Sequence, residues 1–232
     1  MPKAVLFDND GTLVASEPLH WHAWGELMRE LRIDYDPEMI RAQVGQTALV
    51  ILARLLDKYR PGWKPRDYNL SQLAMRKNDI YLEGLEGRLE AYPQTVECLK
   101  WLRAQGIRTG VVSNAKRREM MRAVTVTGLL PYLEVQVSRD DAAAAKPDPA
   151  PYLAAAAMLD LKPSDCMVVE DAPPGLESGL RAGMRCVAIK TNFSEEVLAT
   201  PVRDRPDLRP VAILESMAEF FEELKRCPST FG

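Results

Sequence analysis

Short apolar runs alternate with longer amphipathic segments along most of this chain. Five runs rich in β-branched residues predict strands at residues 3–8, 107–113, 133–138, 166–171 and 186–190. Three of these runs are mostly apolar, as expected for strands that are covered on both faces of a parallel sheet. Helices are predicted between them, at residues 93–106, 115–128, 149–161 and 173–184. This alternation is typical of an α/β fold with a doubly wound, Rossmann-like parallel sheet.

Residues 16–88 depart from the alternation. Three segments with helical spacing, at residues 18–33, 37–60 and 69–92, follow one another without a convincing strand. Apolar positions that include Trp24, Leu27, Leu49 and Leu52 recur at helical intervals, which predicts the core of a small helical bundle. We therefore expect an all-helical domain at residues 16–88, inserted into a core built from residues 1–15 and 89–232. A final amphipathic helix is predicted after the Pro- and Arg-rich stretch at 200–210.

Composition and charge narrow the class of protein. The 232 residues are 47% hydrophobic and 27% charged, within the range of soluble globular proteins. A net charge of −3 gives no reason to expect a nucleic-acid partner, and the apolar runs are too short to span a membrane. The four cysteines lack CxxC spacing, and three of them lie in or beside apolar runs, which is typical of buried, reduced thiols. With a strand starting directly after the N-terminus, we expect no signal peptide, and hence a cytoplasmic protein, as a monomer.

Polar side chains follow the predicted strands at the point where each strand ends. They are Asp8 and Asp10 after the first run, Ser113 and Asn114 after the second, Lys146 after the third, and Glu170 and Asp171 at the end of the fourth. Because the carboxyl ends of parallel strands meet at one edge of a sheet, the carboxylates are expected to converge. Several carboxylates that close repel one another unless a cation lies between them. Mg²⁺ suits such a set of oxygen ligands, here Asp8, Asp10, Glu170 and Asp171, with the Lys146 ammonium nearby.

The same strand ends carry the groups of a phosphate site. Gly11 and Thr12 follow Asp10 in "DNDGT", and Ser113 supplies a second hydroxyl, beside the backbone N–H groups of loop-to-helix turns. A carboxylate that can attack phosphorus points to covalent phosphoryl transfer, with Asp8 as nucleophile. Asp10 is then the acid–base that protonates the leaving oxygen. Taken singly, each motif is equally typical of a turn, a helix N-cap or a surface lysine, but four complementary strand ends favour the functional interpretation.

The four motifs, in this order, resemble those of the haloacid dehalogenase superfamily of phosphotransferases. The resemblance covers nearly the whole chain and implies a Rossmann-like core with a helical cap inserted after the first motif. It assigns Mg²⁺ to the side chains of Asp8 and Asp171 and to the backbone carbonyl of Asp10, with Glu170 close by. It also favours the phosphatase branch over dehalogenation, because Asp10 and Mg²⁺ mark that branch.

Within the superfamily, the chain resembles β-phosphoglucomutase and related sugar-phosphate phosphatases. "SEPLHWHAW" places His20 where the mutase has a histidine that helps control the acid–base aspartate. "RKND" places Lys77 where a lysine partners that histidine, and Asn114 and Lys116 fall in the loop that holds the non-reacting phosphate. His20 is equally consistent with an ordinary polar residue in the first turn of a helix, and Lys77 with a residue on a solvated helix face.

The chain departs from the mutase pattern in the predicted cap loop, "RAQVGQTALV". Val44 precedes Gly45 where the mutase has a lysine, Ala48 stands in place of an arginine, and Gln46 is neutral. An aspartate that is common after the first motif is Ala15 here. A mutase has to hold a bisphosphorylated intermediate, which requires cationic groups on the cap as well as on the core.

Arg41 and Arg76 are the remaining candidates for cationic groups that could hold the second phosphate. Because the cap loop lacks the lysine and the arginine of the mutase, we expect hydrolysis, with water as the acceptor of the phosphoryl group. We therefore predict a Mg²⁺-dependent phosphatase that acts on a small phosphorylated metabolite, a sugar phosphate, with Gly45 and Gln46 in the loop that sets specificity. The alternatives are a phosphosugar isomerase and a non-catalytic sugar-phosphate-binding module.

Overall fold

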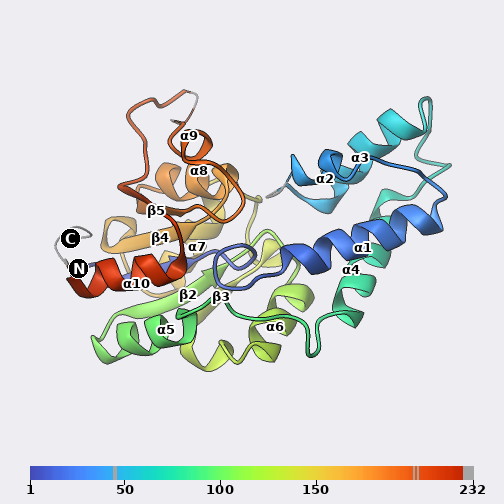
Figure 1. Cartoon of the computed structure of the whole chain (residues 1–232). Helices are drawn as coiled ribbons and strands as arrows, with labels where there is room; N and C mark the ends of the chain where they lie inside the picture. Colours follow the sequence, from blue (N-terminus) through green and yellow to red (C-terminus); the bar gives the residue numbers. More distant parts are fainter. Residues whose placement is uncertain (44–45, 201, 203, 227–232) are drawn as a thin grey trace. The chain divides into compact units, whose positions relative to one another are not determined.

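In the computed structural model, which describes residues 1–43, 46–200, 202 and 204–226, six strands pair in parallel to form one sheet. They are β1 (Ala4–Phe7), β2 (Arg108–Val112), β3 (Val135–Val137), β4 (Cys166–Glu170), β5 (Arg185–Ile189) and β6 (Ala212–Leu214). The order across the sheet is β3-β2-β1-β4-β5-β6. Figure 1 labels β2, β3, β4 and β5 of this sheet. The predicted α/β fold is confirmed, and each of the five predicted strands is present. The sixth, β6, was not predicted, because it is three residues long and only partly buried.

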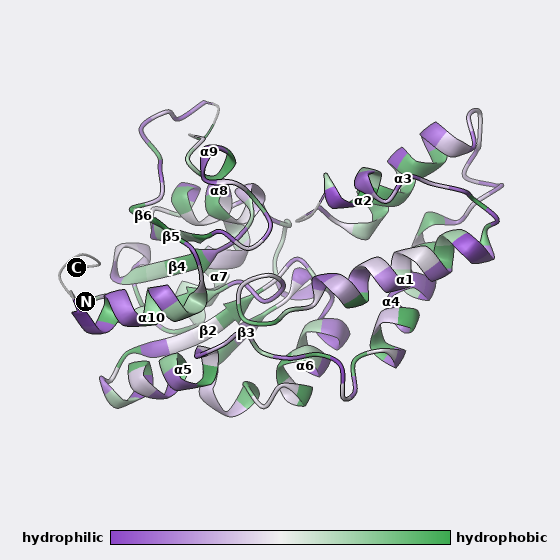
Figure 2. Cartoon of the chain, viewed as in Figure 1, coloured by the Kyte–Doolittle hydropathy of each residue, from purple (hydrophilic) through white to green (hydrophobic). Residues whose placement is uncertain are grey.

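The centre of the sheet is strongly apolar. All four residues of β1 and all five of β4 are buried, and Figure 2 colours most of β4 as hydrophobic. β1 pairs with β2 on one side and with β4 on the other, in the registers Ala4↔Arg108 and Ala4↔Cys166. The chain therefore builds outward from β1 to β3 and then returns to place β4 beside β1. In an open parallel sheet, this reversal is the point where ligands bind, outside the carboxyl ends of the strands.

Helices cover both faces of the sheet. On one face, α5 (Thr95–Ala104) contacts β2 and α10 (Met217–Arg226), and Phe7 of β1 meets Phe220 of α10 edge to face at 6.1 Å. On the other face, α7 (Ala150–Met158) and α8 (Pro173–Arg181) contact each other and share one buried core with the strands. The remaining elements are α6 (Arg117–Val126), α9 (Glu195–Leu198) and the 3₁₀ turns Leu130–Tyr132, Arg139–Asp141 and Pro163–Asp165. Connections between parallel strands are right-handed, so the side of the sheet on which a connecting helix lies depends on the direction in which the next strand is added. The chain adds β2 and β3 on one side of β1 and then β4 and β5 on the other, so the connecting helices after β3 lie on the opposite face.

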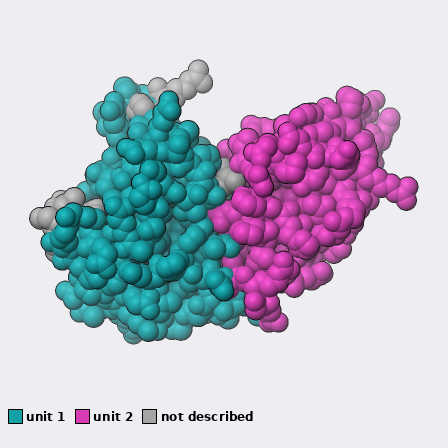
Figure 3. Space-filling view, in the orientation of Figure 1, with its two compact units in different colours: residues 1–15, 90–232 teal, residues 16–89 magenta. Residues whose placement is uncertain are grey.

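The chain divides into two compact units, coloured separately in Figure 3. The first comprises Met1–Ala15 and Glu90–Gly232 and contains the sheet; the second is Ser16–Leu89. The described part of the second unit is helical, with α1 (Glu17–Glu30), α2 (Glu38–Arg41), α3 (Ala48–Tyr59) and α4 (Leu70–Glu83). None of the helices in the described residues is long and apolar enough to cross a membrane.

The core of the helical unit follows the predicted stripes at Trp24, Leu27 and Leu52, whereas Trp21 is only partly buried. α1 and α3 both pack against α4, and Trp24 and Leu27 of α1 are buried. Leu52 is buried as well, but Leu49 is 46% exposed, so its predicted place in the core is wrong. Leu49 lies in the first turn of α3, and the buried face of that helix begins only at Ile51.

Candidate active site

Three buried carboxylates meet where the order of the strands reverses. Asp8 directly follows β1, Glu170 is the last residue of β4, and Asp171 comes next. Each offers one oxygen, and these oxygens lie within 4.8 Å of one another. All three residues are buried, with Glu170 and Asp171 each only 1% exposed. The topology thus brings together acidic groups that are more than 160 residues apart in the sequence.

Lys146 joins two of these carboxylates. Its Nζ donates to Asp8 Oδ1 and to Glu170 Oε1, both at 2.6 Å, and to the carbonyl oxygen of Val112 at 2.7 Å. The amine is buried, so water screens these charges only weakly. Lys146 therefore makes charge-assisted hydrogen bonds that hold Asp8 in one orientation.

The charges of this cluster do not balance by themselves. Three carboxylates carry three negative charges and Lys146 one positive charge, which leaves two negative charges. Burial raises the pKa of Asp8 well above its usual value, and the charge of Glu170 raises that pKa further, while Lys146 lowers it. A divalent cation would supply the missing two charges, and an all-oxygen donor set suits Mg²⁺. The residues present therefore fit the predicted metal, with Asp8, Glu170 and Asp171 as side-chain ligands.

Hydrogen bonds from two other residues orient Asp171. Asn192 Nδ2 donates to Asp171 Oδ2 at 2.7 Å, and Thr12 Oγ1 donates to Asp171 Oδ1 at 3.4 Å. Thr12 was predicted to bind phosphate, but its hydroxyl is fully buried and directed at this carboxylate. The role of Asn192 was not predicted; it lies three residues beyond β5, at the same edge of the sheet, and this position is the one signal that could have found it.

Asp10 lies in a tight turn beside this cluster. The N–H groups of Leu13 and Val14 both donate to the carbonyl oxygen of Asn9, and Gly11 N–H donates to the carbonyl oxygen of Val14. Gly11 has a φ of 88°, a conformation that strongly favours glycine. The carboxylate of Asp10 is not one of the three clustered groups, and its side chain is partly exposed. The turn thus places Asp10 two residues beyond Asp8, at the same edge of the sheet.

The loop after β2 holds the backbone of Lys146 in place through the side chain of Asn114. Asn114 Oδ1 accepts from the Lys146 N–H at 2.9 Å, and Asn114 Nδ2 donates to the Lys146 carbonyl oxygen at 3.2 Å. Ser113 Oγ, buried beside β2, accepts from the N–H of Ala115 at 3.0 Å. The predicted residues Ser113 and Asn114 thus lie in the site, and Asn114 positions the lysine. Lys116 precedes α6 as its N-cap and is exposed.

Four predicted site residues belong to the helical unit. Lys77 Nζ lies 2.7 Å from His20 Nδ1, so the predicted pair is in contact. The imidazole of His20 stacks on Tyr81 at 4.0 Å, and Lys77 Nζ lies 5.3 Å from the centre of the same ring. Gly45 lies outside the described residues, as does Val44, and Gln46 is exposed.

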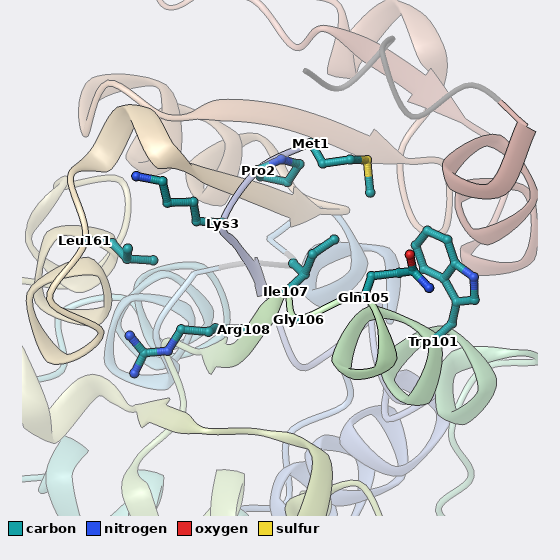
Figure 4. A pocket seen from close by; sticks show the side chains of 9 residues that line it. All are labelled: Met1, Pro2, Lys3, Trp101, Gln105, Gly106, Ile107, Arg108 and Leu161. Carbon is teal, nitrogen blue, oxygen red and sulfur yellow. The ribbon is translucent and has the colours of Figure 1, made fainter.

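A cavity of about 610 Å³ opens at the other end of the sheet, beside the amino ends of β1 and β2 (Figure 4). Its lining includes Pro2, Lys3, Trp101, Ile107, Arg108 and Leu161. Lys3 pairs with Asp165 at 3.1 Å, and Arg108 forms a bidentate pair with Glu134. Because these cations are engaged and the carboxylates lie at the opposite ends of the strands, this cavity is not part of the candidate site.

A family model of haloacid dehalogenase-like hydrolases matches residues 2–183. The chain belongs to this family. A validoxylamine A 7'-phosphate phosphatase from Streptomyces hygroscopicus subsp. limoneus is 32% identical over 206 residues, which cover 86% of this chain and 91% of the relative. The hexitol phosphatase A of Escherichia coli is 34% identical over 188 residues, 81% of this chain and 82% of the relative. These matches confirm the predicted family and support the predicted class of enzyme, a phosphatase.

The haloacid dehalogenase-like fold is also shared with solved structures. The crystal structure of CbbY from Rhodobacter sphaeroides, in complex with phosphate, superimposes with a TM-score of 0.81 at 25% identity. The match covers 97% of this chain and 96% of that protein. In the present chain, two residues beside Glu170 were not predicted: Tyr152, which donates to it, and Gly175, whose backbone lies close to it.

Proposed function

We propose that this protein is a Mg²⁺-dependent phosphatase that hydrolyses a sugar phosphate or a similar small phosphate monoester. One observation carries the proposal: Asp8, Glu170 and Asp171 converge at the point where the strand order reverses, and the Lys146 ammonium joins Asp8 to Glu170. The hexitol phosphatase among the relatives supports a polyhydroxylated substrate. When bound among these carboxylates, Mg²⁺ would supply charge stabilisation for the transferring phosphoryl group.

In the first half of the reaction, a carboxylate oxygen of Asp8 attacks phosphorus and the bond from phosphorus to the ester oxygen breaks. Lys146 holds Asp8 Oδ1 at 2.6 Å, which orients the nucleophile and favours its ionised form. Asp10 donates its proton to the leaving oxygen, so the product departs as an alcohol.

In the second half, Asp10 accepts a proton from water as the water oxygen bonds to phosphorus. The bond from phosphorus to Asp8 then breaks and inorganic phosphate leaves. The helical unit, Ser16–Leu89, serves as the cap in this proposal, and its closure would exclude bulk water until transfer is complete.

The charges within the helical unit favour hydrolysis over transfer between sugar hydroxyls. Arg41 pairs with Glu38 at 2.6 Å and stacks over the indole of Trp21, and Arg76 pairs with Glu30 at 2.6 Å. Both guanidinium groups are thus paired with residues of their own unit, which supports hydrolysis over transfer to a second phosphate position.

The test is release of inorganic phosphate by the purified protein from a panel of hexitol phosphates, hexose phosphates and short phosphorylated acids. We expect Mg²⁺-dependent turnover of at least one sugar or polyol phosphate and its loss in Asp8→Asn. Asp207→Asn, at an exposed carboxylate paired with Arg205, is the matched control and keeps full activity. Inactivity towards every ester in the presence of Mg²⁺ would refute the proposed function, and near-normal activity of Asp8→Asn would refute the role of Asp8.

The contact between His20 and Lys77 favours a second candidate, a phosphosugar isomerase similar to β-phosphoglucomutase. Incubation with β-glucose 1-phosphate and a trace of the bisphosphate separates the two functions. Glucose 6-phosphate as product supports the isomerase, whereas free phosphate supports the phosphatase.

A further inference from the structure

Tyr152 contacts both members of the buried Lys146–Glu170 ion pair. Its hydroxyl donates to Glu170 Oε1 at 3.0 Å, and Lys146 Nζ lies 4.9 Å from the centre of its ring. Tyr152 is on α7, which packs against β2 and β3, and it is completely buried. One side chain from a helix therefore contacts the ammonium with its face and the carboxylate with its hydroxyl.

The surroundings of Glu170 leave its carboxylate little freedom. Oε1 accepts from both Lys146 and Tyr152, and Oε2 accepts from the N–H of Ala172 at 3.3 Å. On a further side, the backbone of α8 comes so close that a Cβ at Gly175 would overlap the carboxylate. The terminal torsion of a glutamate is otherwise broad, so these contacts are what select one rotation of the group.

We propose that Tyr152 is a positioning residue for the phosphatase reaction: its hydroxyl fixes the rotation of the Glu170 carboxylate and thereby holds Lys146 against Asp8. The proposal rests on the proposed function for its kinetic consequences. It assigns no bond-making step to Tyr152 itself, because the residue reaches Asp8 only through Lys146 and Glu170.

Loss of the hydroxyl has a definite consequence in this geometry. In Tyr152→Phe the ring remains under Lys146, but Oε1 of Glu170 keeps a single side-chain donor, so the rotation of the carboxylate is less tightly fixed. Both the lysine and the Mg²⁺-binding oxygens are then less well ordered. Removal of a group that orients a metal ligand typically costs 10- to 100-fold in metal affinity or activity. We expect a roughly tenfold weaker Mg²⁺ affinity and a roughly tenfold lower kcat, with the KM for the phosphate ester nearly unchanged.

The experiment measures Mg²⁺ binding by calorimetry on the full-length protein without substrate, and kcat and KM on the best ester of the panel. Tyr132→Phe is the matched control, because Tyr132 also carries a lysine over its ring, Lys100 at 5.7 Å, but lies away from the carboxylates. Tyr132→Phe is expected to match the wild type in both measurements. Circular dichroism shows whether each variant is folded, and Glu170 retains Lys146 and the Ala172 N–H as donors in Tyr152→Phe, so we expect it to fold.

A double-mutant cycle with Glu170→Gln identifies the route of the effect. If Tyr152 acts through Glu170, adding Tyr152→Phe to Glu170→Gln changes Mg²⁺ affinity by less than about twofold. A wild-type Mg²⁺ affinity in Tyr152→Phe, or an undiminished effect in the Glu170→Gln background, would overturn the proposal. The calorimetric result stands even if no ester is turned over, so failure of this inference and failure of the proposed function are distinguishable.

Discussion

Replacement of Gly175 by alanine tests whether α8 constrains the site. Gly175 lies in α8 without a positive φ, so a helix-propensity argument alone predicts that alanine stabilises the protein by about 1 kcal/mol. The tertiary structure predicts the opposite result. A Cβ at this position would lie closer than 3.0 Å to Glu170 Cδ, Oε1 and Oε2, a separation that real Cβ atoms essentially never show.

The size of the effect follows from what Glu170 would lose. The carboxylate has to leave its present position, and with it the hydrogen bonds from Lys146 and Tyr152. Breaking a buried ion pair while its charges stay buried costs about 3–5 kcal/mol. After the gain in helix propensity, we expect Gly175→Ala to be destabilised by about 2–4 kcal/mol, which lowers Tm by about 5–15 °C. Mg²⁺ affinity and kcat should each fall at least tenfold.

The assay combines a thermal melt with Mg²⁺ calorimetry and phosphate release at a temperature where the variant is folded. Gly179→Ala is the control within the same helix: its Cβ would lie 2.7 Å from Cys186 Sγ and 3.0 Å from a Val168 methyl group, away from Glu170. That variant should lose about 1–3 kcal/mol through overpacking but keep the Mg²⁺ affinity of the wild type. A Gly175→Ala protein that binds Mg²⁺ and turns over substrate normally would show that α8 does not constrain Glu170.

Three further predictions concern the metal, the core and the cysteines. Mg²⁺ should raise Tm, with about 2.7 kcal/mol of stabilisation at one hundred times its Kd, and EDTA should reverse the shift; the absence of any shift would argue against a metal at the carboxylates. Asn9 Oδ1 is buried without a hydrogen-bond partner, so Asn9→Leu should raise stability by about 1–2 kcal/mol in a denaturant titration, and a decrease would contradict that assignment. Burial raises the pKa of the Cys98 thiol to about 12 and of Cys166 to about 11. Each thiol is neutral below its pKa, so at pH 8 iodoacetamide should label neither until the protein unfolds, as peptide mass spectrometry would show; labelling of the native protein would contradict the burial.

Much of the fold could be predicted from the sequence, because strands buried on both faces form nearly continuous apolar runs. The strands ending near Asp8 and Glu170 have this pattern and were predicted. β6 was missed since its three residues are only partly buried and carry too short a signal. Leu49 was misplaced because the helical period indicates a face but does not determine at which turn that face becomes buried.

The sequence by itself determined which chemical groups stand at the ends of the strands: paired aspartates after the first strand, a lysine after the third, and a Glu-Asp pair at the end of the fourth. The tertiary structure decided how these groups meet. Lys146 bridges Asp8 and Glu170 because β4 lies beside β1, and Tyr152 and Gly175 reach Glu170 because α7 and α8 cover one face of the sheet. The physical reason is that hydropathy patterns arise from local burial, whereas contacts between distant side chains depend on strand order and helix packing, which local pattern does not specify.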